Sequence, residues 1–158
     1  MASHNSINTD IYPAIEPKNF TGKLKGKVVF ITGAAQGIGQ GIAIAMAKAG
    51  ATLALVDLKK EKLESTVKQC EELGSKVLPL EANVVDQKAV DKALDEYFLK
   101  VGELMCRTEE KLGEIDVLVN NAGTNYRRPY HMMTFEEFWN VIEINFKAVC
   151  FRTMTFAD

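Results

Sequence analysis

The sequence has few cysteines, and their arrangement does not suggest a metal site or a disulfide framework. Its 158 residues contain three, Cys70, Cys106 and Cys150, with no Cys-x-x-Cys pair among them. An odd, widely spaced set fits free thiols in a reducing compartment better than disulfides or a zinc site. We therefore expect a cytoplasmic protein that binds no metal.

Long apolar runs and a surplus of one charge are also missing. The longest nearly apolar stretches, Val28–Ile31 and Gly41–Met46, are far shorter than the roughly 20 residues that a membrane span requires. The 19 basic and 21 acidic side chains give a net charge of −2, and no block of Lys and Arg could neutralise a phosphate backbone. We expect neither a membrane nor a nucleic acid as a partner.

What is present is an ordinary globular composition in a chain of single-domain length. Hydrophobic residues make up 47% of the chain and charged residues 25%, which is usual for one folded domain. The first 26 residues are polar, contain two prolines and two glycines, and lack the apolar segment of a secretory signal. We expect a flexible polar lead-in over residues 1–26 and one domain over residues 27–158.

Short runs rich in Val, Ile and Leu alternate with helical patterns along this domain. Because strands buried on both faces of a parallel sheet are apolar throughout, we expect strands over residues 28–31, 52–56, 77–80 and 115–119. Helices are expected between them and after a Thr134-x-x-Glu137 capping box. The series predicts an α/β fold with a doubly wound, Rossmann-type parallel sheet of strand order 3-2-1-4. Its ligand crevice should lie at the carboxyl ends of the strands.

The crossover between the third and fourth expected strands is unusually long. Residues 86–112 form a stretch of 27 residues, which would extend for about 40 Å as one straight helix. A strand of five or six residues spans only about 20 Å. We therefore predict that an insert around Gly102–Thr108 breaks this helix or loops out of it.

A glycine-rich segment, TGAAQGIG, follows the first expected strand. Its first glycine permits a tight turn, its second allows a pyrophosphate to approach the backbone, and its third lets the next helix pack closely. The alternative is that the glycines only shape a strand-to-helix turn. As a dinucleotide-binding loop, the segment offers these candidate residues: Gly33, Gln36, Gly37, Ile38 and Gly39.

An acidic residue, Asp57, ends the second expected strand, 24 residues after Gly33. Its carboxylate can accept hydrogen bonds from both hydroxyls of an adenosine ribose and would repel a 2′-phosphate, which favours NAD over NADP. Lys59 and Lys60 lie close by and oppose that preference, although both also suit an exposed helix start. The alternative for Asp57 is a solvated acid in a turn.

The glycine-rich segment together with Asn120-Asn121-Ala122-Gly123 resembles the short-chain dehydrogenase/reductase family, which carries TGxxxGIG and NNAG at these places. The resemblance extends from about Lys27 to Phe151. It implies a nicotinamide-dependent oxidoreductase that transfers a hydride to or from a small alcohol or carbonyl compound. The stretch Asn120–Trp139 is most similar to members acting on sugar acids and polyols.

The resemblance also implies roles for particular residues. Asn145 matches the helix asparagine whose backbone carbonyl holds a water linked to the catalytic lysine, and the alternative is a polar residue on a helix flank. Asn121 would contact the nicotinamide-side ribose or hold the strand ends together. The remaining cofactor-binding residues implied are Ala122 and Gly123 beside it, and Asn83 and Val84 near the adenine, where Asn83 replaces the Asp common in the family.

The family's catalytic Tyr-x-x-x-Lys is absent from this sequence, because none of its four tyrosines has a lysine four residues later. No serine follows Ser75. Since the implied domain needs about 250 residues, we expect a chain truncated after the helix that follows the fourth strand, and inactive as given. The full-length form is expected to be a homo-oligomer. The alternative is a non-catalytic module that binds NAD or a partner protein.

Overall fold

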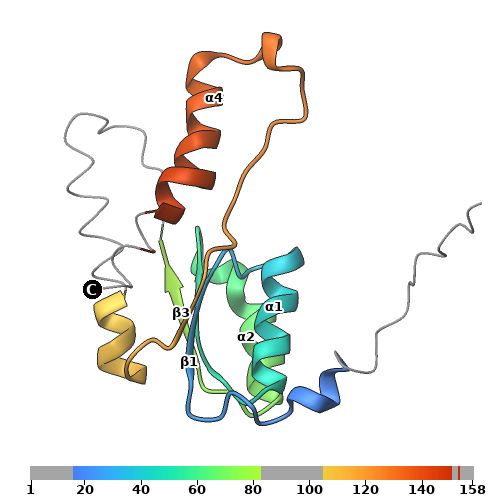
Figure 1. Ribbon diagram of the computed structural model, residues 1–158, viewed down its shortest axis with the longest axis vertical. Helices are drawn as coiled ribbons and strands as arrows, with labels where there is room; N and C mark the ends of the chain where they lie inside the picture. The colour runs from blue at the N-terminus through green and yellow to red at the C-terminus, as the bar shows by residue number, and fades with distance from the viewer. Residues whose placement is uncertain (1–15, 83–104, 151–152, 154–158) are drawn as a thin grey trace, which may run out of the picture.

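Four parallel strands form the centre of the structure, a computed structural model in which residues 16–82, 105–150 and 153 are described. The strands are β1 (Val28–Thr32), β2 (Thr52–Asp57), β3 (Val77–Glu81) and β4 (Val117–Val119). Their order across the sheet is β3-β2-β1-β4, and every neighbouring pair is parallel. The predicted α/β class and strand order are confirmed (Figure 1).

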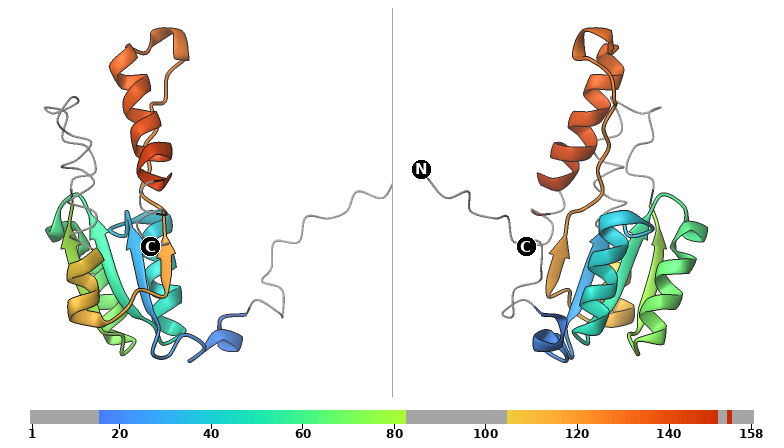
Figure 2. Two further views of the ribbon diagram at one scale, coloured as in Figure 1. Left: turned by 60° about the vertical axis from the view of Figure 1, so that its left-hand side comes forward. Right: turned by 90° about the vertical axis from the view of Figure 1, so that its right-hand side faces the viewer.

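Helices cover both faces of this sheet. Helices α1 (Gly37–Lys48) and α2 (Glu64–Glu72) lie on one face, and the helical residues 105–112 lie on the other (Figures 1 and 2). The predicted strand–helix alternation is therefore observed. The other described elements are the 3₁₀ turns η2 (Pro17–Phe20), η3 (Lys60–Leu63) and η4 (Tyr130–Met132), the helix α4 (Phe135–Ile142) and the π-helical turn η5 (Glu143–Lys147).

The core is split into two layers by the alternation of side chains along the strands. On one face, Val29 and Ile31 of β1 are fully buried in a cluster that includes Ala43 of α1 and others from α2. On the opposite face, Phe30 packs in a second cluster with Met105. The all-apolar strand sequences are explained by this burial on both sides.

Residues 105–108 of the predicted insert Gly102–Thr108 are helical and do not loop out, and a break at residues 102–104 stays a prediction. Residues 105–112 are helical, and within them Met105 and Thr108 are 5% and 0% exposed. These two residues are three apart, so they lie on one helix face and are buried together against the sheet. The prediction used only the length of the crossover, and length does not show that one face of residues 105–112 is buried. Residues 102–104 lie outside the described residues, as do the predicted adenine-side residues Asn83 and Val84.

Upstream of Lys27, the described chain packs against the domain. The 3₁₀ turn η2 contacts α1. Leu24 donates its backbone N–H to the carbonyl of Ala49 at 2.8 Å, and its side chain packs on the core. The packing contacts of the domain thus include residues that precede β1 in the chain.

Helix α4 lies beyond the carboxyl ends of the strands, as both ribbon figures show (Figures 1 and 2). Its N-terminus has the predicted capping box, in which the Thr134 hydroxyl accepts the Glu137 N–H and the Glu137 carboxylate accepts the Thr134 N–H. Helix α4 therefore begins where the sequence predicts. None of the helices in the described part of the chain is long and apolar enough to cross a bilayer.

Candidate functional site

A cavity of about 640 Å³ lies at the carboxyl ends of the strands. It is bordered by the loop after β1, the end of β2, the chain after β4 and helix α4, so it sits at the edge predicted for a ligand. Its lining residues include Thr32, Gly33, Ala35, Gln36, Ile38, Gly39, Asp57, Lys62, Asn121, Ala122, Gly123, Thr124, Tyr126, Asn140 and Ile144.

The glycine-rich loop has the backbone geometry that its sequence predicts. Gly33 and Gly37 have φ angles of +66° and +59°, a region that side chains disfavour. A Cβ on Gly39 would lie 2.0 Å from the carbonyl oxygen of Gly33, so only glycine allows the helix to start this close to the loop. Gly37 is not among the cavity-lining residues, although its neighbours Gln36 and Ile38 are.

The N-terminus of α1 opens on the cavity without a side-chain cap. Gln36 occupies the N-cap position and makes no capping hydrogen bond, and the first turn contains no acidic residue. The first N–H groups of a helix lack intrahelical partners and carry a partial positive charge. Together with the glycine geometry, this opening fits an anionic group such as a pyrophosphate.

Asp57 binds the loop as well as facing the cavity. Its carboxylate accepts the N–H of Ala35 at 3.0 Å and the N–H of Leu58 at 2.8 Å. The alternative of a solvated turn acid therefore does not describe it, because the side chain is half-buried and fixes the loop after β1. An ionised carboxylate has about four acceptor positions, so two remain for a ligand.

Asn121 ties the ends of β1 and β4 together, one of the two roles expected for it. Its Nδ2 donates to the carbonyl oxygens of Thr32 and Gly33, each at 3.0 Å. The Thr32 hydroxyl accepts the N–H groups of Asn121 at 3.2 Å and Ala122 at 3.1 Å. This network fixes the Asn-Asn-Ala-Gly segment against the glycine-rich loop, and it places Ala122 and Gly123 on the cavity wall.

Thr66 of α2 is a site residue that the sequence analysis missed. Its side chain is fully buried, and its hydroxyl lies 3.0 Å from the carbonyl oxygen of Ala34 and 3.2 Å from that of Ala35. Gln40 of α1 donates to the same hydroxyl at 3.2 Å. The available signal was a polar residue between apolar ones on the inward stripe of α2, because such residues need buried partners.

Asn145 lies in the π-helical turn η5 and holds the chain that follows Gly123. Its Nδ2 donates to the carbonyl of Thr124 at 2.7 Å, and its Oδ1 accepts the Thr124 N–H at 2.9 Å. A Cβ on Gly123 would lie 2.9 Å from that Oδ1, so this glycine leaves room for the contact. The side chain of Asn145 is therefore a clamp on the loop, and it does not line the cavity.

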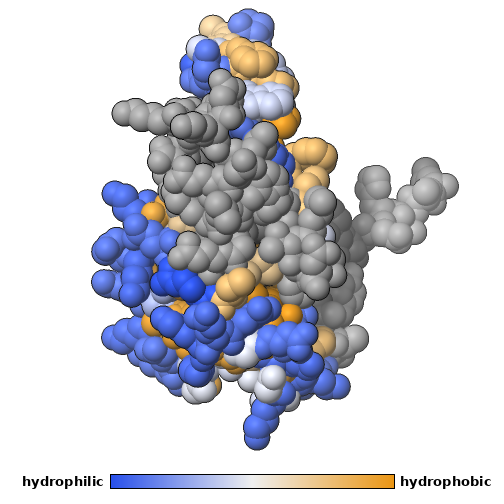
Figure 3. All heavy atoms as spheres, turned by 90° about the vertical axis from the view of Figure 1, so that its left-hand side faces the viewer, coloured by the Kyte–Doolittle hydropathy of each residue, from blue (hydrophilic) through white to orange (hydrophobic). Residues whose placement is uncertain are grey.

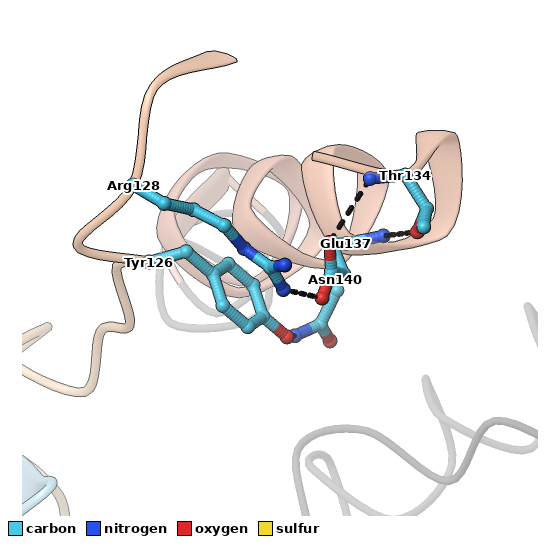
Figure 4. Close-up of polar contacts among 5 residues, drawn as sticks. All are labelled: Tyr126, Arg128, Thr134, Glu137 and Asn140. Carbon is cyan, nitrogen blue, oxygen red and sulfur yellow. Dashed lines mark hydrogen bonds and ion pairs between the residues drawn. The ribbon is translucent and has the colours of Figure 1, made fainter. Parts of the chain in front are cut away.

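Tyr126 and Asn140 also line the cavity, and the sequence analysis gave neither a role. The Asn140 Nδ2 donates to the Tyr126 hydroxyl oxygen at 3.3 Å (Figure 4). The two residues are 14 positions apart and come from the loop and from α4. Only the folded chain brings them together.

The cysteines and acids do not form a metal centre in the described residues, where no group of three or more His, Cys, Asp or Glu side chains converges. Cys70 is buried, whereas Cys106 and Cys150 are exposed, and none of the three forms a disulfide. Burial, followed by the charge of Glu71, raises the pKa of the Cys70 thiol to about 11. A thiol in that state is an inert core side chain.

Comparisons with known proteins agree on one family. The model described as "short chain dehydrogenase" matches residues 27–158. The 3-oxoacyl-[acyl-carrier-protein] reductase FabG of Thermotoga maritima is 39% identical over 127 residues, covering 80% of this chain and 47% of that protein. The 5-keto-D-gluconate 5-reductase of Escherichia coli K12 is 34% identical over 126 residues, covering 80% of this chain and 45% of that protein.

Solved structures give the same result. A short-chain type dehydrogenase/reductase from Mycobacterium marinum superposes with a TM-score of 0.75 at 28% identity, covering 90% of this chain and 51% of that one. The chain thus spans about half the length of the relatives that it matches.

Proposed function

Because the chain belongs to the short-chain dehydrogenase family, we propose that it provides the NAD(P)-binding part of an oxidoreductase. The observation that carries this proposal is the uncapped N-terminus of α1, which opens on a cavity that also contains the Asp57 carboxylate. The partial positive charge at this helix N-terminus suits a pyrophosphate, and the carboxylate at the same cavity suits the hydroxyl groups of a ribose.

In this proposal each part of the cavity binds one part of the cofactor. The backbone at the start of α1 binds the pyrophosphate, with Gln36, Ile38 and Gly39 closest to it, while Gly33 and Gly37 provide the turn. Asp57 binds the adenosine ribose, which favours NAD over NADP, and Asn83 with Val84 contacts the adenine. On the other side of β1, the nicotinamide half lies against Asn121, Ala122 and Gly123.

When bound, the nicotinamide supplies the carbon that accepts or donates the hydride. Asn121 keeps β1 and β4 at a fixed spacing under that end of the cavity. We propose that the backbone carbonyl of Asn145 holds a water of the proton relay. Since this sequence has no Tyr-x-x-x-Lys, we expect the 158-residue chain to bind cofactor without turnover. That absence equally favours the second candidate, a module that binds NAD or a partner without catalysis.

The substrate proposed is a small alcohol or carbonyl compound, with sugar acids and polyols as the first class to test. The Escherichia coli relative is named for a reaction on 5-keto-D-gluconate, and it covers 80% of this chain. We also propose that the full-length enzyme is a cytoplasmic homo-oligomer.

The test of cofactor binding is a calorimetric titration of the chain with NADH and NADPH, using Gln36→Glu as the informative variant. A glutamate at this exposed N-cap position suits the helix dipole, so folding is preserved, but its charge repels a pyrophosphate. We expect NADH to bind the wild type, and to bind Gln36→Glu about fivefold or more weakly.

The matched control is Gln69→Glu, which adds the same charge on an exposed position of α2 away from the cavity. It should bind NADH as the wild type does. If the wild type binds neither nucleotide at millimolar concentration, or if both variants weaken binding equally, the proposed function is wrong.

A further inference from the structure

The chain after Gly123 is attached to the last helix by three polar contacts at alternate positions. Thr124 pairs with Asn145, Tyr126 with Asn140, and Arg128 with Glu137. We call this set the three-rung clasp (Figure 4 shows its second and third rungs). Thr124 and Tyr126 are half-buried, whereas Asn125 and Arg127 between them are exposed, as expected for an extended chain with one side against a helix.

The helix residues of the clasp have a spacing that a regular α-helix does not provide. Glu137 and Asn140 are three apart, but Asn145 follows five residues later, where an α-helix would bring residue 144 onto that face. The π-helical turn Glu143–Lys147 adds one residue to the turn and so returns Asn145 to the loop side. The Thr124–Asn145 rung of the clasp therefore depends on the irregular turn.

The middle rung is the one whose two side chains both line the cavity. Tyr126 and Asn140 are cavity residues, whereas neither Arg128 nor Glu137 is, and Asn145 lies outside the lining as well. Arg128 sits 5.8 Å from the centre of the Tyr126 ring, and it is held in turn by Glu137 of the capping box. Tyr126 is thus held at two points, with the Arg128 cation over its ring and the Asn140 amide at its hydroxyl.

Hydrogen-bond counting shows what this rung offers to a ligand. The Tyr126 oxygen accepts from Asn140, so its own O–H remains a donor, and no acceptor for it occurs among the described residues. The Asn140 Oδ1 likewise receives no donor within the described part of the chain. One donor and one acceptor therefore remain on two adjoining side chains, both of which line the cavity. A hydrophobic substrate would leave both unpaired.

We propose that Tyr126, oriented by Asn140, recognises an oxygen of the substrate other than the one that reacts. This inference rests on the proposed function. The Tyr126 hydroxyl donates to a carbonyl or hydroxyl oxygen, and Asn140 Oδ1 accepts from a neighbouring hydroxyl. The substrate class is then a ketone or alcohol with further hydroxyl groups, and simple aliphatic ketones are disfavoured.

The experiment uses the full chain saturated with NADH and two probes, 5-keto-D-gluconate and 2-pentanone, titrated by calorimetry. Tyr126→Phe removes one hydroxyl and keeps the ring. Tyr130→Phe removes the same group from a side chain that is 79% exposed and outside the cavity lining. We expect Tyr126→Phe to bind 5-keto-D-gluconate about three- to tenfold more weakly, as for the loss of one hydrogen bond. Tyr130→Phe should match the wild type.

Two further measurements distinguish recognition of the substrate oxygen from a general disturbance of the structure by the substitution. NADH affinity should be equal in the wild type and both variants, and 2-pentanone should bind the wild type and Tyr126→Phe alike. If Tyr126→Phe retains wild-type affinity for 5-keto-D-gluconate, or if the NADH-loaded wild type binds no 5-keto-D-gluconate, the inference is wrong while the proposed function stands. Failure of the wild type to bind NADH at all would instead overturn the proposed function.

Discussion

The Asp57 carboxylate illustrates how one residue serves both the fold and the cavity. It accepts two backbone N–H groups, from Ala35 and Leu58, and it still borders the space in which a ribose is proposed to bind. In register with it on the neighbouring strand stands Glu81, an acid that does not line the cavity. Variants of these two acids can therefore be compared to separate two effects on cofactor affinity: the loss of a negative charge, and the loss of a carboxylate at the cavity.

We predict that Asp57→Asn reduces the affinity for NADH by about tenfold or more, because hydrogen bonds to a charged acceptor contribute about 1.5–3 kcal/mol. NADPH should lose less, because its 2′-phosphate no longer meets a negative charge, so the preference for NADH narrows. Calorimetric titrations with both cofactors measure this, and Glu81→Gln is the control with the same loss of charge. Equal or reversed preference in the wild type would contradict the prediction and point to Lys59 and Lys60.

At the scale of elements, the short strand β4 is joined to β1 at its amino end by one acidic side chain. The Asp116 Oδ2 accepts the N–H of Val28 at 2.8 Å, and its Oδ1 pairs with the Lys27 ammonium group. The backbone N–H of Asp116 donates to the carbonyl of Val28 at 2.9 Å. The hydrogen bond from Lys27, followed by that from Val28, lowers the pKa of Asp116 below its ordinary value of 3.8.

This shift predicts an acid-sensitive contribution to stability. Because the folded-state pKa of Asp116 is lowered, the contribution is fully present above pH 3.8 and is lost as the pH falls through the lower folded-state pKa. We expect Asp116→Asn to be less stable than the wild type at pH 7, with a difference that shrinks below pH 3.8. Urea unfolding between about pH 2.5 and pH 7 measures it.

The control for that series is Glu109→Gln, which neutralises an exposed acid on the helical residues 105–112. The free energy of unfolding of this variant should differ little from that of the wild type at every pH. A constant destabilisation of Asp116→Asn across the range would contradict the prediction, since it would mean that the hydrogen-bonding shape matters and the charge does not.

At the scale of the whole molecule, apolar side chains are exposed around α4 and the loop before it. Tyr130, Met132, Phe135 and Phe146 are between 62% and 79% exposed. The space-filling view shows hydrophobic side chains beside hydrophilic ones at this tip of the molecule (Figure 3). Within the described residues, no strand pairs with the outer edge of β4. Exposed strand edges and apolar patches favour association with another chain.

We predict that the 158-residue chain self-associates at micromolar concentration through β4 and α4. Sedimentation velocity should show species larger than the 17.5 kDa monomer. Phe135→Glu replaces a side chain that is 72% exposed, so it should reduce association without affecting the core. A wild type that stays monomeric and unfolds in one cooperative thermal transition would contradict the prediction and favour a non-catalytic binding module.

The sequence by itself determined the strands, their order and the glycine-rich loop. These depend on patterns within a few residues: apolar runs of strand length, glycines at fixed spacing, and the Thr134–Glu137 capping box, which the structure forms as expected. Local patterns are readable because neighbouring residues impose them directly through backbone sterics and hydrogen bonding.

Only the tertiary structure decided how the cavity is held together. The Thr66 hydroxyl meets the carbonyl of Ala34 across 32 positions of sequence, and Asn145 meets Thr124 because a π-helical turn changes the phase of the last helix. Such contacts depend on where whole elements pack, and no short pattern specifies that. The long crossover shows the same limit, because Met105 and Thr108 are buried on one face of the helical residues 105–112, which include part of the stretch where length alone predicted a break.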